Sequence, residues 1–130
     1  MLDAAEEQRR SRAVTRRLAS TLTNLGFASG AGAGCVRPLG GGTCKVWLQK
    51  FRHQPAFRVA MSFAAPGRAR PAVEFSDRWT YRDSPAGRRF DFDLRGGEDA
   101  AERCLREIRA FVEIVALPWF EAQAAAAGKE

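Results

Sequence analysis

Apolar side chains recur every three to four residues through the first fifth of the chain. Their spacing is that of one face of an α-helix: Val14, Leu18, Leu22 and Leu25. Asp3 followed by Glu6 has the form of a capping box, which is typical of a helix start. Gly26 is a common residue just past a helix end. The sequence therefore predicts an N-terminal helix over residues 1–26.

The period changes from 3.6 to 2 after a glycine- and alanine-rich segment at residues 27–34, which we predict to be a loop. Alternation is clearest where Phe57, Val59, Met61 and Phe63 share one face. A run of three glycines at 40–42 predicts a hairpin turn centred on Gly41. The strands predicted from these patterns, which place an antiparallel sheet within residues 35–95, are 35–39, 43–52, 56–64, 73–82 and 88–94.

A second helical stripe follows Gly96-Gly97 and predicts a C-terminal helix over residues 97–122. Its apolar positions are Leu105, Ile108, Phe111, Val112 and Val115. Pro118 must kink or restart this helix, because proline has no N–H to donate. Residues 123–130 are predicted to form a frayed tail. The expected fold is α+β, in the order α-β-β-β-β-β-α. A five-stranded, mainly antiparallel sheet has both helices packed on one face.

Length, charge and cysteine content indicate the class of protein and its cellular compartment. With 130 residues, the chain has the length of a single domain. Its formal charge is +6, and residues 28–65 hold five bases and no acid, so an anionic partner is allowed but not required. No apolar run approaches the roughly 20 residues of a membrane span, and the acidic start lacks the apolar centre of a signal peptide. Three cysteines without paired spacing predict reduced thiols in the cytoplasm.

Catalytic and metal chemistry find little support in the sequence. His53 is the single histidine, and it falls at a polar strand end where a solvated turn is the commoner role. The three cysteines and His53 lack the usual zinc spacing, so we predict neither metal nor cofactor. Asp91 and Asp93 project from the same face of a predicted strand, where they could do acid–base work or bind a cation. Ion pairs with neighbouring arginines are the favoured interpretation of both aspartates.

The strand at 43–52 combines basic and aromatic residues. Lys45, Trp47, Gln49 and Phe51 share one of its faces, which would be a stacking platform for nucleic acid only if that face is open. The same residues could anchor a protein partner. Our candidate partner-binding residues are Trp47, Gln49, Lys50, Phe51, Arg52 and Trp79.

Several short signatures resemble a family of small, mostly bacterial proteins that is known only as a domain of unknown function. The matching segments are Leu25-Gly26-Phe27, Val46-Trp47-Leu48-Gln49-Lys50-Phe51, Phe57-Arg58-Val59 and Ala116-Leu117-Pro118-Trp119-Phe120. The resemblance covers roughly residues 10–122, and the chain departs from the family pattern at residues 28–34. The resemblance implies a single α+β domain without an assigned activity, in a family with some members at toxin–immunity loci. It carries over no functional residues.

These observations favour a non-enzymatic module that binds another protein, as an immunity-like or accessory protein would. Nucleic-acid binding through the basic, aromatic strands is the alternative. A small-ligand protein or enzyme that uses Asp91 and Asp93 is a second alternative. Homodimerisation through the sheet would also bury Trp47 and Phe51.

Overall fold

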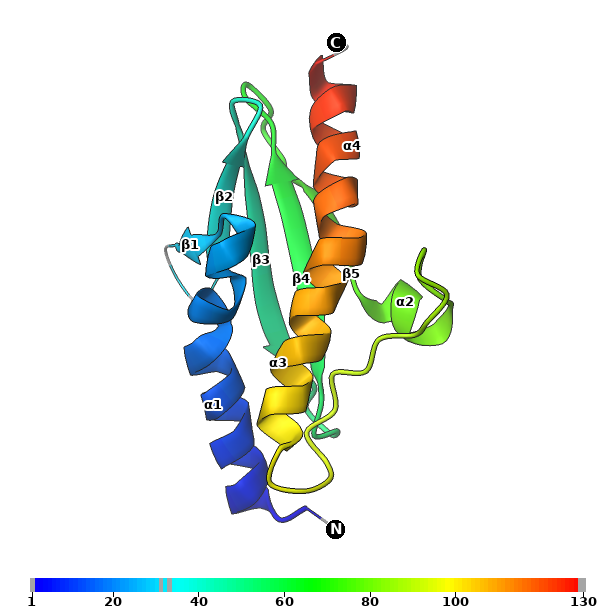
Figure 1. Cartoon of the computed structure of the whole chain (residues 1–130). Coiled ribbons are helices and arrows are strands. Elements are labelled where there is room, and N and C mark those ends of the chain that lie inside the picture. Colours follow the sequence, from blue (N-terminus) through cyan, green and yellow to red (C-terminus); the bar gives the residue numbers. More distant parts are fainter. Residues whose placement is uncertain (1, 31, 33, 129–130) are drawn as a thin grey trace.

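The computed structural model describes residues 2–30, 32 and 34–128 (Figure 1). The first helix, α1 (Ala4–Leu22), begins at the predicted cap, because the Asp3 carboxylate accepts the backbone N–H of Glu6 at 2.8 Å. Its apolar stripe is buried in the core. A 3₁₀ turn, η1 (Thr23–Leu25), follows, and Gly26 ends the helix with a φ of 88°, a left-handed conformation that favours glycine. The predicted cap at Asp3 and the predicted end at Gly26 are thus present, although the α-helix itself covers only Ala4–Leu22 and its last turn is 3₁₀.

Five antiparallel strands form one sheet in which each strand pairs with its neighbours along the chain. The helices cover one face of it, so the α+β prediction is confirmed (Figure 1). The strands are β1 (Ala28–Ser29), β2 (Cys35–Leu39), β3 (Gly42–Lys50), β4 (Phe57–Ala64) and β5 (Ala72–Phe75). β1 lies inside the segment predicted to be a loop, where it pairs with the start of β2.

The hairpin between β2 and β3 is shifted by one residue from the prediction. Leu39 pairs with Gly42, so the turn consists of Gly40 and Gly41, both with positive φ (56° and 81°), which the twist of a two-residue hairpin favours. Cys44 therefore lies opposite Arg37, and Cys35 lies opposite Val46, instead of Pro38 and Trp47. The two thiols are still not cross-strand neighbours.

Two predicted strands are wrong in part. The strand expected at 73–82 ends at Phe75, because the buried Ser76 turns the chain and its hydroxyl accepts the N–H of Val59. The short helix α2 (Asp77–Tyr81) follows. Residues 88–94 form only an isolated bridge between Ala56 and Asp93. Alternation along that segment, with Asp91 and Asp93 outward, predicts that Phe90, Phe92 and Leu94 point inward, and all three are buried.

The C-terminal helical region runs without interruption through α3 (Ala100–Phe111), η2 (Val112–Ala116) and α4 (Leu117–Gly128). The middle segment is a π-helix in which the N–H of Leu117 bonds to the carbonyl of Val112. Pro118 has no N–H for the carbonyl four residues earlier, and the wider π turn accommodates this loss. The predicted kink thus takes the form of a π segment. The predicted tail is helical up to Gly128, and residues 129–130 lie outside the described part.

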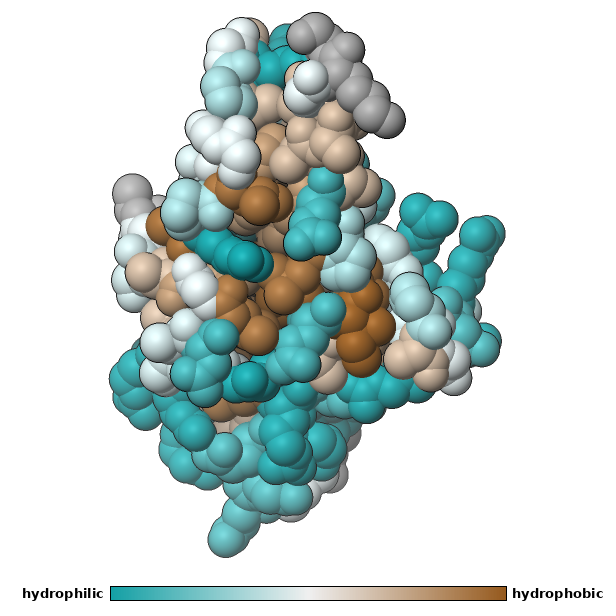
Figure 2. Space-filling view, turned by 45° about the horizontal axis from the view of Figure 1, so that its top comes forward, coloured by the Kyte–Doolittle hydropathy of each residue, from teal (hydrophilic) through white to brown (hydrophobic). Residues whose placement is uncertain are grey.

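The core lies between the sheet and the helices, with Phe111 of α3 at its centre. The rings of Trp79, Phe90 and Phe92 meet Phe111 edge-on. Figure 2 looks down towards the helical side, and it shows polar side chains over the lower half of the molecule and apolar residues across the middle. The region 100–128 is long and apolar enough to cross a membrane by length and composition alone, but core helices pass the same test, and its buried residues pack in this core.

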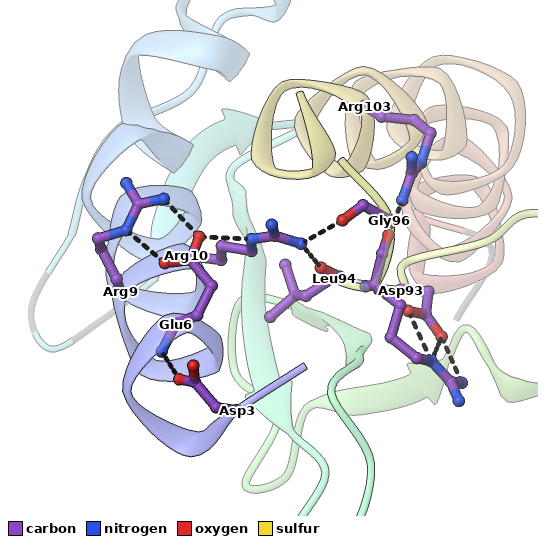
Figure 3. A network of polar contacts seen from close by, with 9 residues as sticks. Asp3, Glu6, Arg9, Arg10, Asp93, Leu94, Gly96 and Arg103 are labelled. Carbon is purple, nitrogen blue, oxygen red and sulfur yellow. Dashed lines mark hydrogen bonds and ion pairs between the residues drawn. The ribbon is translucent and has the colours of Figure 1, made fainter. Parts of the chain in front are cut away.

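A buried arginine fastens the start of α1 to the segment that precedes α3 (Figure 3). Arg10 is 8% exposed, and its guanidinium donates to the carbonyls of Leu94 at 2.7 Å and Gly96 at 3.0 Å. Its Nε also donates to the Glu6 carboxylate at 2.9 Å, which in turn pairs with Arg9. The charge of Arg10 is thus satisfied inside the fold, as a buried cation requires.

Candidate functional site

The face of the sheet that points away from the helices is open (Figure 1). Antiparallel register aligns its side chains in rows across the strands. Trp47 of β3, Ala60 of β4 and Phe75 of β5 form one row, and Lys45, Ser62 and Val73 form the next. We call these two rows, together with Gln49 and Arg58 beside them, the open face.

The centre of the open face is apolar and tightly filled. Ala60 is 0% exposed although no helix lies above it, because the large rings of Trp47 and Phe75 flank it in register. Val73 in the neighbouring row is 47% exposed, and among the described residues only Tyr81 is also a large apolar side chain with that degree of exposure. An apolar patch on a sheet without a covering layer is typical of an interaction surface.

Arg58 is held rigidly at one end of the open face. Its Nε and Nη2 donate to the two carboxylate oxygens of Asp77 at 2.7 and 2.6 Å, a bidentate pair that raises the pKa of Arg58. The guanidinium also lies 4.9 Å from the ring centre of Phe75 and 5.5 Å from that of Phe51. Since Asp77 begins α2, this pair ties α2 to β4 and neutralises most of the charge of Arg58.

Lys45 is the other cation of the open face, and its environment differs. Its ammonium lies 5.3 Å from the ring centre of Trp47, and no carboxylate of the described residues lies within ion-pair distance. The outward-facing positions of β2 to β5 include no acidic residue. The open face therefore has one cation without a carboxylate partner among the described residues, Lys45, beside an apolar centre.

The structure brings together only part of the predicted partner-binding set. Trp47 and Gln49 lie on the open face, and Phe51 follows β3 beneath the Arg58 guanidinium. Arg52 is exposed in the turn after β3. Lys50 points to the helical side, where it pairs with Glu7 at 3.1 Å and donates to two backbone carbonyls.

Trp79 lies apart from the open face, because it belongs to α2 and packs its ring against Phe111 in the core. The sequence pattern predicts a strand for Trp79 instead. The same pattern does not reveal that Ala60, Phe75 and Val73 are neighbours of Trp47. The alternation in residues 56–64 already assigned Arg58 and Ser62 to the face opposite the core, but only strand register reveals which residues of β5 meet them.

A cleft of about 400 Å³ lies between the turn at 51–56, α2 and residues 89–93. Its aromatic walls include Phe57, Phe90 and Phe92, and Asp91 and Asp93 line it together. Burial raises the pKa of Asp93, but hydrogen bonds from Arg95 outweigh this effect and lower the pKa overall. The predicted pairing with an arginine is present for Asp93, since Arg95 Nη2 lies 2.6 Å from its carboxylate. Asp91 has no ion pair with an arginine of the described residues, because Arg88 pairs with Glu107 and Arg89 with Asp83. Asp91 accepts the N–H of Asp93 at 3.0 Å.

The remaining candidates for chemistry are dispersed. His53 is exposed in the turn and does not line the cleft. All three cysteines are buried and form no disulfide bond. Burial raises the pKa of Cys44 to about 11 and that of Cys104 to about 12. In the part of the chain that the structure describes, no three metal-ligating side chains gather in one group.

Comparisons with known proteins return no match: no family model, no curated protein and no solved structure is significantly similar to this chain. The resemblance to a family of unknown function therefore stays a prediction.

Proposed function

We propose that this chain is a non-enzymatic protein-binding module that docks its partner on the open face. The observation that carries the proposal is the row of Trp47, Ala60 and Phe75, which crosses three strands on the side without helices. Large aromatic side chains beside cations are typical centres of protein interfaces. The three buried thiols suit a reducing compartment, so we propose a cytoplasmic location.

Nucleic-acid binding is supported less well than protein binding, although the face is open. Bases need uncovered ring faces on which to stack. Here the ammonium of Lys45 lies over Trp47, and the guanidinium of Arg58 lies over Phe75. Arg58 is also paired with Asp77, which leaves Lys45 as the one cation of the open face that could meet a phosphate without competing with a carboxylate of the described residues.

A small-ligand role is the second candidate, because aromatic walls and the carboxylates of Asp91 and Asp93 converge on one cleft. Both carboxylates already have hydrogen-bond partners within the chain. A thermal-shift screen of small organic cations against the wild type and Asp91→Asn tests this role. A rise in melting temperature that Asp91→Asn abolishes would favour the cleft over the open face.

Affinity capture from native lysate tests the main proposal. The baits are the wild type, Trp47→Ala and Arg16→Glu, each with and without nuclease. Arg16 is exposed on α1, so its variant controls for a change of charge on the covered side. We expect a stoichiometric protein that survives nuclease and is lost with Trp47→Ala alone.

The other outcomes separate the alternatives. Captured nucleic acid that disappears with nuclease would assign the open face to nucleic acid, and a steep loss of affinity with salt would accompany it. If nothing is captured and sedimentation shows a dimer that Trp47→Ala dissociates, the open face is a self-association surface. Capture that Trp47→Ala leaves unchanged would contradict the open face as the docking site.

A further inference from the structure

The edges of the sheet offer an incoming strand few unpaired backbone groups. At one edge, β5 has four residues, and the N–H of Phe75 is already bonded to the Glu74 carboxylate at 3.2 Å. At the other edge, β1 covers the start of β2, and Pro38 in the uncovered part has no N–H to donate. Charges and prolines of this kind blunt sheet edges against strand addition. A partner is therefore expected to lie on the open face rather than to extend the sheet.

The dimensions of the open face suit a helix. Neighbouring strands lie about 4.8 Å apart, so the row from β3 to β5 spans roughly 10 Å, which matches the diameter of an α-helix with its side chains. The opposite face of the same sheet is already covered by helices (Figure 1). The apolar stripe of an amphipathic helix would cover Trp47, Ala60 and Phe75, and it would also reach the exposed Val73.

The charges of the open face select the kind of helix. Lys45 has no carboxylate partner among the described residues, and the outward-facing positions of β2 to β5 have no acid that would pair with a basic partner. A second copy of this chain that docked through the same face would bring no carboxylate to Lys45. We infer that the open face binds an acidic amphipathic helix of a partner protein, with a carboxylate placed against Lys45. This inference rests on the proposed function and specifies its partner.

Two synthetic peptides test the inference. Both are labelled amphipathic helices of about 18 residues, or five turns, with the same leucine stripe. One carries glutamate along the flanks of the stripe, and the other carries lysine at the same positions. Fluorescence anisotropy measures their binding to the wild type, Trp47→Ala, Lys45→Glu and Arg16→Glu. The last two variants change the net charge equally, but one lies on the open face and the other on α1.

We expect the acidic peptide alone to bind the wild type. Trp47→Ala and Lys45→Glu should each weaken its binding about tenfold or more, because they remove the central anchor and reverse the pairing charge. Arg16→Glu should change the affinity by less than about twofold, since a remote surface charge is screened by salt. Lys45→Glu should also increase binding of the basic peptide.

The remaining outcomes distinguish this inference from the proposed function. Equal binding of both peptides, weakened only by Trp47→Ala, would keep the docking surface and overturn the acidic partner. If neither peptide binds but Trp47 is needed to capture a protein from lysate, the proposed function stands and the acidic helix is wrong. If neither peptide binds and Trp47 is not needed for capture, both are wrong. Circular dichroism of each variant confirms that the fold is intact.

Discussion

The two faces of the five-stranded sheet differ in exposure and in charge, although the same strands supply both. On the covered face, Val46, Val59 and Met61 are completely buried beneath the helices. On the open face, Lys45 and Trp47 of the same strand as Val46 remain partly exposed. The charges differ as well. On the helical side, Arg9, Arg10, Arg17 and Lys50 each pair with a carboxylate. On the open face, Arg58 pairs with Asp77, whereas Lys45 has no ion pair with the described residues.

The comparison distinguishes the side chains that stabilise the fold from those that the fold does not require. Burial of the inward residues accounts for the sheet and its helices, since a two-layer domain has one core between its layers. The row of Trp47, Ala60 and Phe75 adds a second apolar cluster that no helix requires. Aromatic residues on the side without a layer are therefore the part of this molecule that a binding function explains best.

The largest expected difference between the two faces is in the accessibility of their thiols. Cys35, Cys44 and Cys104 are buried on the covered side, and burial raises the pKa of each thiol. We expect them to react with an aromatic disulfide reagent on the order of 1,000-fold more slowly than a thiol introduced by Val73→Cys, because they require unfolding of a domain stable by roughly 5 kcal/mol or more. Denaturant should expose all of them equally. Rapid reaction of a native thiol in the folded state would contradict the covered face as described.

A second test compares one large aromatic residue from each environment. Phe111→Ala should lower the free energy of unfolding by about 3–5 kcal/mol, because it leaves a cavity at the centre of the core. Trp47→Ala should cost only about 1–2 kcal/mol, since it removes cross-strand contacts from a face open to water. Urea unfolding followed by circular dichroism measures both values. Equal losses would mean that Trp47 serves the core as much as Phe111 does.

Much of this contrast could be predicted from the sequence. Period-2 alternation in residues 56–64 separated inward Phe57 and Val59 from outward Arg58 without any structure. The stripes of both long helices and the cap at Asp3 were also predictable, because local spacing and capping chemistry determine them. The inward burial of Phe90 and Phe92 was correct even though their segment is not a paired strand.

The parts that failed depend on contacts between distant residues. Ser76 ends β5 because its hydroxyl binds the backbone of Val59, which local propensity cannot reveal. The hairpin register moved by one residue, because any two of three consecutive glycines can form the turn. Membership of the open face required both strand pairing and helix placement. The sequence could therefore suggest Trp47, and alternation along the strand already placed Lys50 on the opposite face, but Trp79 could not be excluded from the surroundings of Trp47.

A third prediction concerns the buried cation of the covered side. Arg10→Met should lower the free energy of unfolding by about 2–3 kcal/mol, because it leaves the carbonyls of Leu94 and Gly96 without their donor (Figure 3). Arg9→Gln is the matched control, since Arg9 shares the Glu6 carboxylate but its side chain is mostly exposed. That control should change stability by less than about 0.5 kcal/mol. Equal effects in urea unfolding would show that the carbonyl contacts of Arg10 contribute little.

The smallest expected effect is on the pH dependence of stability, to which the ion pairs of Glu6 with Arg9 and Arg10 contribute. Hydrogen bonds from Arg9 and Arg10 lower the pKa of Glu6 from 4.5 to about 2. The folded state thus favours the ionised carboxylate. Its contribution is complete above the unfolded pKa and is lost as the pH falls from about 4.5 to about 2. Glu6→Gln should therefore lower the melting temperature at pH 7, and its difference from the wild type should shrink towards zero near pH 2.

Glu121→Gln removes the same charge from the exposed surface of α4 and serves as the control for that pH series. It should follow the wild type at every pH, because no ion pair of Glu121 with the described residues stabilises the fold. A constant difference between Glu6→Gln and the wild type across the series would show that ionisation of Glu6 does not account for its contribution to stability. A difference in melting temperature that disappears only at low pH would show that the paired charges on the covered side stabilise the fold. Lys45 on the open face has no such carboxylate partner among the described residues.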